Sequence, residues 1–472
     1  MKDLLYIWAI ALASIFLTAC DDDDFTLSPS AVLTFSADTV KVDTVFSNTP
    51  SAMRTFWAYN RNGSGLRCTS IRLERGNQSG FRVNVQGTYL GPESGYQTSD
   101  VELRKGDSLR VFVEVTPARQ NSPEPTLVED NLLFTLESGQ VQKVNLQSFA
   151  WNATLVRSLQ VTRDTTLAGP VPIVIQGNVQ VAPGATLTLA PGTTLYFHGS
   201  AGMEVGGCLK SLGTADEPVT LRGDRIDHMF DYLPYDRVSG QWHGIHFAES
   251  SYGNELVYTD LHGAFDGIVA DSADVTRLKL SLINSTVHNS KGVGVSLNQV
   301  KAVLENSQIT NSLRQCVSIT GGDVSINQCT IAQFYPFDGN RGAAFAMTGP
   351  LVNMLCQNTL ITGYADDEMM ITTHKKLTYR FADCIIRTPK ITTADSVYFT
   401  RVVYEDIEDT THCGRKHFAR MNTHNLIYDF GLDSLSSAIG RASQLTALPH
   451  DRLGRRRDEH PDIGAYEYLN HR

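Results

Sequence analysis

Carboxylates, cations and aromatic side chains recur in short segments between residues 262 and 368, a mixture that could bind or cleave a sugar. A pair of carboxylates can hydrolyse a glycosidic bond, one protonating the leaving oxygen and the other activating water. Asp338 with Asp366 or Asp367 could supply such a pair. Without catalysis, the same mixture suits a sugar-binding groove. The predicted binding residues are Asp266, His288, Arg314, Tyr335, Asp338, Arg341, Asp366, Asp367 and Glu368.

Polysaccharide lyase chemistry is an alternative for the same segments. It needs a base, here Arg314, to take the proton beside a uronate carboxyl, and carboxylates such as Asp366 to Glu368 to hold Ca²⁺. We therefore expect Ca²⁺ only if the protein is a lyase, and otherwise no cofactor. No metal site is predicted either, because His243 and His246 would point to opposite faces of a strand. No known catalytic motif matches residue by residue, and acidic runs on turns are usually solvated. The sequence thus favours binding over catalysis.

A repeated hexapeptide precedes these segments and would bring them together. Its copies are residues 282–287, 304–309, 326–331, 355–360 and 381–386, and a shorter match ends at Leu261. Self-similarity at a spacing of 22 to 29 residues is typical of a solenoid, in which each coil buries its apolar side against its neighbours. Stacked coils would align the following segments into one strip, which also includes His262, Lys291 and Tyr364, with residues 334–342 standing out as a lip.

The third and fourth hexapeptide positions are polar or cysteine, and we interpret them as structural. The third positions are Asn284, Asn306, Gln328, Gln357 and Asp383. With coils ~4.8 Å apart, we expect these side chains to bond to one another along the stack. Cys329 and Cys384 would lie two coils, about 9.6 Å, apart, too far for a disulfide, so both are expected to stay reduced. The other cysteines are expected to be mostly buried thiols.

Residues 177–223 ("GNVQVAPGATLTL…EPVTLRG"), followed by Trp242-His243-Gly244-Ile245, resemble the first coils of right-handed parallel β-helix proteins of the pectin-lyase type. The resemblance implies an all-β solenoid over residues 155–470. Asp451, Gly454 and Arg457, followed by residues 461–467, resemble the terminal phrase of such proteins, so we expect a last coil and cap at about 445–470. Because this fold carries lyases, hydrolases and non-enzymatic binding proteins, it does not by itself select a function.

Residues 31–150 contain about seven short stretches in which apolar and polar residues alternate, separated by turn residues. This spacing predicts an antiparallel β-sandwich. The stretch "LRKGDSLRVFVEVTP" (103–117), followed by "NLLFTLESG" (131–139), resembles the Ig-like modules of bacterial surface proteins. We therefore expect an Ig-like sandwich before the solenoid.

The first 30 residues predict a lipid anchor. The apolar run 4–17 is too short to span a bilayer as a helix, which needs ~20 residues. Leu17-Thr18-Ala19-Cys20 resembles the signal of bacterial lipoproteins, which implies removal of residues 1–19 and lipidation of Cys20. Residues 20–30 would form an acidic tether. Asp21 to Asp24 resemble a Bacteroidota surface-export signal, although in other Gram-negative groups an Asp after the cysteine resembles an inner-membrane retention signal.

A formal net charge of −10 argues against nucleic acid as a partner, since no net cationic surface remains to neutralise phosphates. The favoured interpretation is an outer-membrane lipoprotein facing the cell exterior, which recognises a glycan or a cell-envelope partner through the β-helix without catalysis. Two alternatives stay open. One is a polysaccharide lyase or glycoside hydrolase acting in a groove on the β-helix. The other is an accessory subunit of an outer-membrane protein complex.

Overall fold

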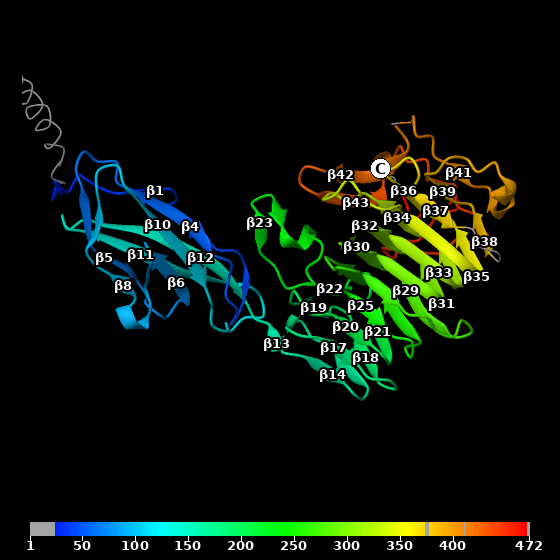
Figure 1. Ribbon diagram of the computed structural model, residues 1–472, viewed down its shortest axis with the longest axis horizontal. Helices are drawn as coiled ribbons and strands as arrows, with labels where there is room; N and C mark the ends of the chain where they lie inside the picture. Colours follow the sequence, from blue (N-terminus) through cyan, green and yellow to red (C-terminus); the bar gives the residue numbers. More distant parts are fainter. Residues whose placement is uncertain (1–23, 373–376, 410, 470–472) are drawn as a thin grey trace, which may run out of the picture. The chain divides into compact units, whose positions relative to one another are not determined.

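The computed structural model describes residues 24–372, 377–409 and 411–469. The chain forms two compact units that divide between Asn152 and Ala153, and both are built from β-strands (Figure 1). Among the described residues, no helix is long and apolar enough to cross a membrane. The predicted signal peptide, Cys20 and the first three aspartates of the tether lie outside the described residues.

The first unit is a sandwich of two β-sheets. One sheet has the order β1 (Thr34–Phe35), β4 (Arg54–Tyr59), β10 (Ser108–Val115), β6 (Phe81–Val85), β7 (Thr88–Tyr89). The other has the order β2 (Thr39–Lys41), β12 (Val141–Trp151), β11 (Thr126–Leu136), β5 (Leu66–Leu73), β8 (Gln97–Thr98), with β3 (Val45–Phe46) beside β12 and β9 (Val101–Leu103) beside β5. Alternate residues of each strand, such as Val111 in β10 and Phe134 in β11, fill one core between the sheets. Its assignment to the Ig-like class stays a prediction.

The second unit is a right-handed parallel β-helix, as predicted from the sequence. One face is an eleven-stranded sheet in which every neighbouring pair is parallel. Its strands are β13 (Thr154–Val156), β16 (Ile173–Ile175), β19 (Thr194–Phe197), β22 (Val219–Gly223), β27 (Thr259–His262), β30 (Thr286–Ser290), β32 (Gln308–Ser312), β34 (Thr330–Gln333), β36 (Leu360–Gly363), β39 (Ile385–Ile386) and β41 (Val403–Tyr404).

A sixteen-stranded sheet forms the rest of the wall. The long strands β31 (Val295–Glu305), β33 (Val317–Asn327) and β35 (Phe345–Gln357) join two runs of shorter strands within it. The first run is β14 (Leu159–Val161), β17 (Val179–Val181), β20 (Met203–Val205), β25 (Ile245–Phe247) and β28 (Ile268–Ala270); the second is β15 (Thr165–Leu167), β18 (Thr186–Leu189), β21 (Cys208–Leu212), β26 (Asn254–Val257) and β29 (Leu278–Ile283). After β35 come β37 (Met369–Thr372), β38 (Leu377–Ala382) and β40 (Phe399–Thr400).

Each hexapeptide spans the corner between the two sheets. The corner residue has a positive φ, which, apart from glycine, residues with short polar side chains such as asparagine and aspartate tolerate best. These residues are Asn284, Asn306, Gln328, Asn358 and Asp383, with φ between 46° and 56°. The predicted alignment was wrong by one residue in the copy at 355–360, because Ile331 pairs with Ile361 and not with Leu360. Leu360 and Ile361 are both buried, on opposite sides of the sheet, so apolar spacing alone could not choose between them.

The predicted ladder of corner amides was also wrong. Asn306 Nδ2 donates to the carbonyl of His450 at 2.8 Å, and Asn358 Oδ1 accepts the N–H of Ser443 at 2.8 Å. The side chains of Asn306, Gln328 and Asn358 therefore bind the C-terminal segment instead of one another, whereas Asp383 pairs with Arg401. The following position does connect successive coils: Ser285 Oγ accepts the N–H of Thr259 at 3.0 Å.

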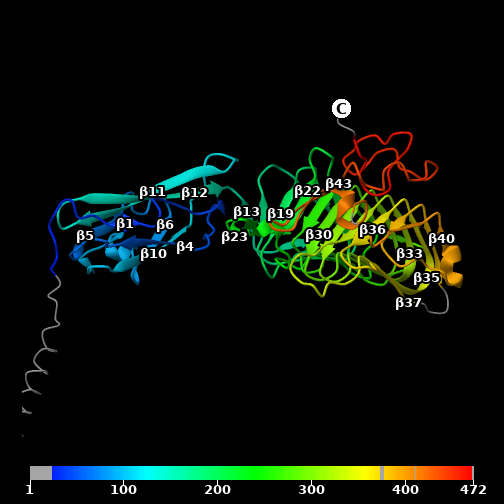
Figure 2. The same ribbon diagram turned by 90° about the horizontal axis from the view of Figure 1, so that it is seen from above.

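The C-terminal segment lies along the side of the β-helix and does not form its last coil, contrary to the prediction. Residues 443–466 contact corner residues of three successive coils. The hairpin of β42 (Phe418–Asn422) and β43 (Ile427–Leu432) lies against the same face (Figures 1 and 2). Together they cover apolar residues on the outer side of the eleven-stranded sheet, including Phe334 and Ile385. Those outward apolar residues explain why the segment packs there.

The interior of the β-helix is apolar and holds most of the cysteines. Five of the seven described cysteines are buried and two are half-buried, which confirms the prediction of mostly buried thiols. Cys356 and Cys384 belong to successive coils, and their Sγ atoms lie 4.0 Å apart. Burial raises the pKa of Cys329 to about 12, so this thiol stays protonated.

Candidate functional site

Three side chains on the outer face of the eleven-stranded sheet form the centre of the candidate site. Asp260 and His262 are two residues apart on β27, so both point outward while Leu261 between them points into the core. His288 lies opposite His262 on the neighbouring strand β30. The two imidazole centroids are 4.8 Å apart, as expected for side chains in one column of a parallel sheet.

Asp236 completes this group from a different part of the chain. It lies in the short 3-10 helix η2 (Tyr235–Arg237), where the chain crosses over the sheet between β22 and β25. Its Oδ1 is 2.9 Å from Nε2 of His262, whose Nδ1 is 2.8 Å from Oδ1 of Asp260. Arg222 on β22 pairs with the same carboxylate. We call Asp236, Asp260, His262 and His288 the Asp–His cluster.

The electrostatics of the Asp–His cluster favour two carboxylates joined by a charged ring. Burial alone would lower the pKa of His262, but the carboxylates of Asp260 and Asp236 outweigh it and raise this pKa to about 9. Burial likewise opposes ionisation of both acids. The nearby His262 ring overcomes that effect and lowers the pKa of Asp236 and of Asp260. Near neutral pH, neither acid therefore carries a proton that it could donate to a leaving group.

A groove of about 370 Å³ opens beside the cluster, between the sheet and the hairpin β42–β43. We call it the cap groove. Three buried polar atoms of its lining residues have no hydrogen-bond partner among the described residues: Oδ1 of Asn311, Oη of Tyr428 and Nε of Arg452. The lining comprises Asp236, Arg237, Asp260, Thr286, His288, Asn289, Gln308, Asn311, residues 426–430, Arg452 and Tyr466. Asp429 and Tyr466 also line a second hollow of about 510 Å³, which extends the groove along the C-terminal segment.

The residues of the predicted strip do not lie together in the structure. His288 joins the Asp–His cluster, but from a strand and not from a turn. Asp266 accepts the N–H of Val293 in the next coil at 2.8 Å, a structural role. Arg314 and Asp338 are exposed, and Asp338 bonds within its own loop, to the N–H of Asn340 at 2.8 Å.

The loop 334–342 does not stand free as a lip. Tyr335 is only 4% exposed, and its Oη lies 2.7 Å from Oγ of Ser239 in the segment that carries Asp236. Arg341 donates to the carbonyl of Tyr335 at 3.2 Å and lies over the ring of Tyr364, 4.7 Å from its centroid. These contacts hold the two ends of the loop, whereas residues 337–340 between them are exposed.

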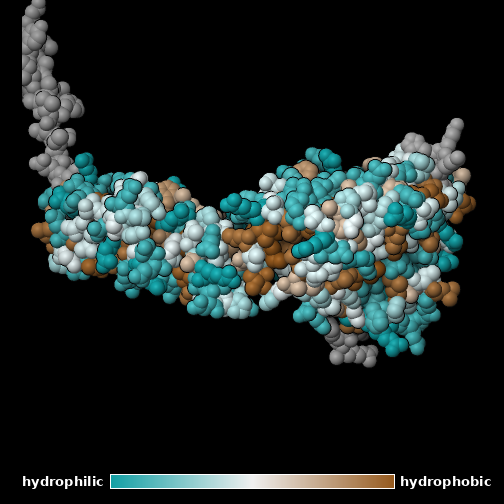
Figure 3. All heavy atoms as spheres, turned by 90° about the horizontal axis from the view of Figure 1, so that it is seen from below, coloured by the Kyte–Doolittle hydropathy of each residue, from teal (hydrophilic) through white to brown (hydrophobic). Residues whose placement is uncertain are grey.

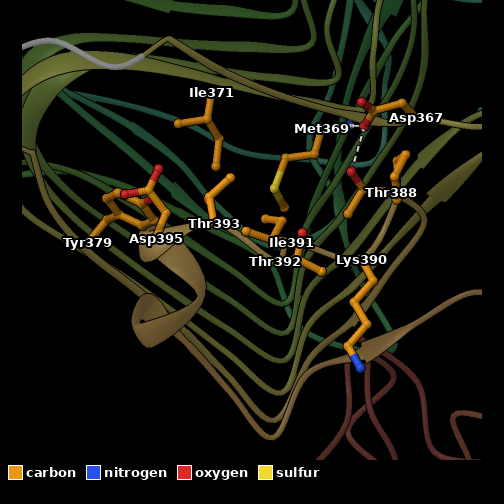
Figure 4. A pocket seen from close by; sticks show the side chains of 11 residues that line it. Asp367, Met369, Ile371, Tyr379, Thr388, Lys390, Ile391, Thr392, Thr393 and Asp395 are labelled. Carbon is orange, nitrogen blue, oxygen red and sulfur yellow. Dashed lines mark hydrogen bonds between the residues drawn. The ribbon is translucent and has the colours of Figure 1, made fainter.

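The acidic run 366–368 makes three unrelated contacts. Asp366 is largely exposed and lies 3.7 Å from Arg387. Asp367 accepts from Thr388 Oγ1 at 2.8 Å at the edge of a hollow of about 350 Å³ (Figure 4). Glu368 is buried, and its two oxygens accept the N–H groups of Ala344 and Ala365. Asp338 shares none of these contacts, so nothing joins it to Asp366 or Asp367 as a catalytic pair.

A second histidine-containing group lies under the hairpin. Glu405 and His417 are fully buried, with Oε1 and Nε2 3.0 Å apart, and Cys413 is close to both. The other oxygen of Glu405 already bonds to Arg387 at 3.1 Å and to the N–H of Gly414 at 3.0 Å. Burial raises the pKa of Cys413 to about 11, so its thiol stays protonated. We interpret this group as structural.

Sequence reasoning missed Asp236, Asp260 and Arg222. The hexapeptide alignment already placed Leu261 opposite Val287, which puts His262 opposite His288, and Asp260 follows from the alternation of a strand. Asp236 lies in a loop outside the repeat, and no sequence signal locates it.

The comparisons with known proteins add no functional argument. No family model matches the chain, and no curated protein does. Among solved structures, the chain is similar to a family 123 glycoside hydrolase from Clostridium perfringens (7% identity, 28% of this chain but only 30% of that one, TM-score 0.19). It is also similar to a GH87 α-1,3-glucanase from Streptomyces thermodiastaticus (11% identity, 73% of this chain and 76% of that one, TM-score 0.31). A third similar structure is a family 28 exopolygalacturonase from Yersinia enterocolitica (9% identity, 79% of this chain and 87% of that one, TM-score 0.15). The parallel pairing of the strands alone assigns this chain to the parallel β-helix proteins.

Proposed function

We propose that this protein recognises a glycan in the cap groove without cleaving it, and that a lipid on Cys20 holds it on the outer membrane facing the cell exterior. The observation that carries the proposal is a groove of about 370 Å³ whose lining combines amides, tyrosines and arginines. Binding sites for small ligands are typically 300–1,000 Å³ and contain a few convergent polar groups. A ligand rich in hydroxyls would match the amide, tyrosine and arginine side chains of this lining.

The chemistry of the lining supports a sugar over an apolar ligand. Asn289 and Gln308 are planar amides that can bond to neighbouring hydroxyls, while Tyr428 and Tyr466 offer ring surface with a polar tip. Arg237 and Arg452 provide cations, so a glycan with carboxylate or sulfate groups would also be accommodated.

The state of the carboxylates supports binding over hydrolysis. A glycosidase needs one carboxylic acid that keeps its proton until the leaving oxygen takes it. The pKa of Asp236 and that of Asp260 are both lowered by the His262 ring against the effect of burial. Asp236 and Asp260 therefore do not form the pair of one protonated and one ionised acid that this reaction requires.

An outer-membrane protein partner is the competing possibility, with the sandwich as the docking unit. Large apolar residues with more than a third of their surface exposed are spread over that unit: Leu27, Val32, Met53, Trp57, Tyr89, Leu127, Val141 and Phe149. On the part of the sandwich drawn in Figure 3, apolar residues are scattered among hydrophilic ones. Large contiguous apolar patches are what mark protein interfaces, so the groove is the stronger candidate.

The test is a panel of polysaccharides and glycans applied to the full chain in detergent, scored for binding and for new reducing or unsaturated ends. We expect binding without products, and a loss of affinity of about tenfold in Tyr428→Phe. Tyr89→Phe, an exposed tyrosine of the sandwich, is the matched control and should bind normally. Product release would overturn the non-catalytic proposal. Equal binding by both variants would exclude the cap groove.

A further inference from the structure

Three donor atoms of the Asp–His cluster converge on one point. A carboxylate oxygen of Asp260, one ring nitrogen of His262 and one of His288 all lie within 4.8 Å of one another. Asp260 Oδ1 is 2.8 Å from Nδ1 of His262 and 3.3 Å from Nε2 of His288. Zinc binds nitrogen and oxygen donors at about 2.0–2.2 Å, so donors around one ion are separated by distances of this size.

Asp236 fixes the orientation of the central ligand. A carboxylate only accepts hydrogen bonds, so His262 must present its Nε2–H to Asp236 Oδ1, at 2.9 Å. Without a metal, the charged ring also donates its Nδ1–H to Asp260, at 2.8 Å. A metal ion would replace that proton and bind the lone pair on Nδ1, while Asp236 keeps the proton on Nε2. An acid bonded to the far nitrogen of a ligand histidine is the usual arrangement around protein-bound metals. Asp236 is therefore a positioning residue.

The ligands are held on rigid elements. Asp260 and His262 are on β27 and His288 is on β30, strands paired in register within the eleven-stranded sheet. The buried Trp242 donates from Nε1 to the carbonyl of His262 at 2.9 Å and so fixes the backbone at the central ligand. Arg222 brings a positive charge nearby, but that charge is already paired with Asp236.

We propose that Asp260, His262 and His288 bind a divalent transition-metal ion, namely zinc, and that the remaining coordination positions of the ion face the cap groove. Two imidazoles with one carboxylate suit zinc and its first-row neighbours, whereas Ca²⁺ and Mg²⁺ prefer sets of oxygen ligands. His288 and Asp260 both line the groove, so an ion held by three protein ligands would present an open position to its contents.

Two other groups that contain histidine lack the set of metal donors found in the Asp–His cluster. His246 also bridges two carboxylates, Glu204 at 2.6 Å and Asp271 at 2.9 Å, but through opposite nitrogens and with no second histidine. Glu405 in the buried group already binds a guanidinium. Among the described residues, the Asp–His cluster thus offers the better-matched donor set, and His246 provides the control.

The experiment is zinc titration of the metal-free full chain in detergent, in mildly alkaline buffer because the ion must replace a proton on His262. We expect about one ion per chain. The variants His288→Gln and Asp260→Asn should each weaken binding by at least tenfold, and Asp236→Asn by about 10–100-fold. His246→Gln should bind as the wild type does. Cobalt in place of zinc should give visible absorption bands that the wild type and His246→Gln share and His288→Gln lacks.

Either of two results would overturn the proposal: no saturable binding of zinc or cobalt by the wild type, or equal affinity in the wild type and in His288→Gln. The cobalt spectrum of the wild type needs no variant to fold, and it must indicate nitrogen ligation. Neither measurement includes a glycan, so the outcome is independent of the proposed function.

Discussion

The guanidinium of Arg457 and the carboxylate of Glu467 form an ion pair at 2.9 Å in which each side chain is only 2% exposed. Arg457 also donates to Oδ1 of Asn306 at 3.1 Å and to the carbonyl of Gly464 at 3.0 Å. Glu467 accepts the N–H of Asp462 at 3.1 Å. The pair therefore fastens the C-terminal segment to a corner of the β-helix.

Arg457→Ala should lower the free energy of unfolding of the β-helix by about 3–5 kcal/mol, because it leaves the buried Glu467 carboxylate without its partner. Arg456→Ala is the control, since the neighbouring Arg456 is exposed and its loss should change stability by no more than about 0.5 kcal/mol. Denaturant unfolding followed by tryptophan fluorescence, in which the buried Trp242 reports the β-helix, measures both. Equal effects of the two substitutions would contradict the prediction.

Glu368 should make the β-helix less stable as pH rises. Burial raises the pKa of this carboxyl to about 7 in the folded protein, against hydrogen bonds from Ala365 and Ala344 and the charge of Arg387 that favour ionisation. Between the unfolded value of 4.5 and about 7, the folded state holds a proton that the unfolded state has lost. Stability attributable to Glu368 therefore falls across this window, by up to about 3 kcal/mol.

The measurement compares the wild type with Glu368→Gln at about pH 5 and about pH 8. Gln resembles the protonated acid, so the stability of the variant relative to the wild type should increase from the lower pH to the higher. Asp367→Asn is the control, because Asp367 is exposed and adjacent. A difference between wild type and Glu368→Gln that does not change with pH would show that Glu368 is ionised throughout.

The corner residues should tolerate glycine better than alanine. Asn284 has a φ of 49°, a left-handed conformation that costs most residues with a Cβ roughly 1–2 kcal/mol but costs asparagine less and glycine least. We expect Asn284→Ala to lower the free energy of unfolding by about 1 kcal/mol and Asn284→Gly to change it less. Thermal unfolding of both variants tests this. Greater loss in the glycine variant would mean that the side chain, and not the backbone angle, determines the preference.

The sequence predicted the β-helix because coils of similar length repeat the same apolar spacing. Even at Leu360, the corner of the coil was predicted at the right place and only the pairing was wrong, by one residue. The candidate site was harder to predict because it combines strands of the repeat with Asp236. This residue lies in a loop that crosses over the sheet and is not part of the repeat. His288 was predicted as a site residue on a turn, and the register places it on a strand. The path of the C-terminal segment depends on outward apolar residues such as Phe334, which look like core residues in the sequence.

The hydrogen bond between Tyr335 Oη and Ser239 Oγ, at 2.7 Å, should control how often the loop 334–342 opens. It joins that loop to the segment that carries Asp236. Removing it with Tyr335→Phe costs about 0.5–1.5 kcal/mol, which should raise the population of the open loop by about 2–10-fold. Limited trypsin digestion reads this out as faster cleavage after Arg341, which lies in the loop and contacts the Tyr335 carbonyl. Tyr364→Phe keeps the ring under Arg341 and should leave the cleavage rate unchanged. The same rate in Tyr335→Phe as in the wild type would show that ring packing alone, including that of Phe337 against Tyr335, holds the loop closed.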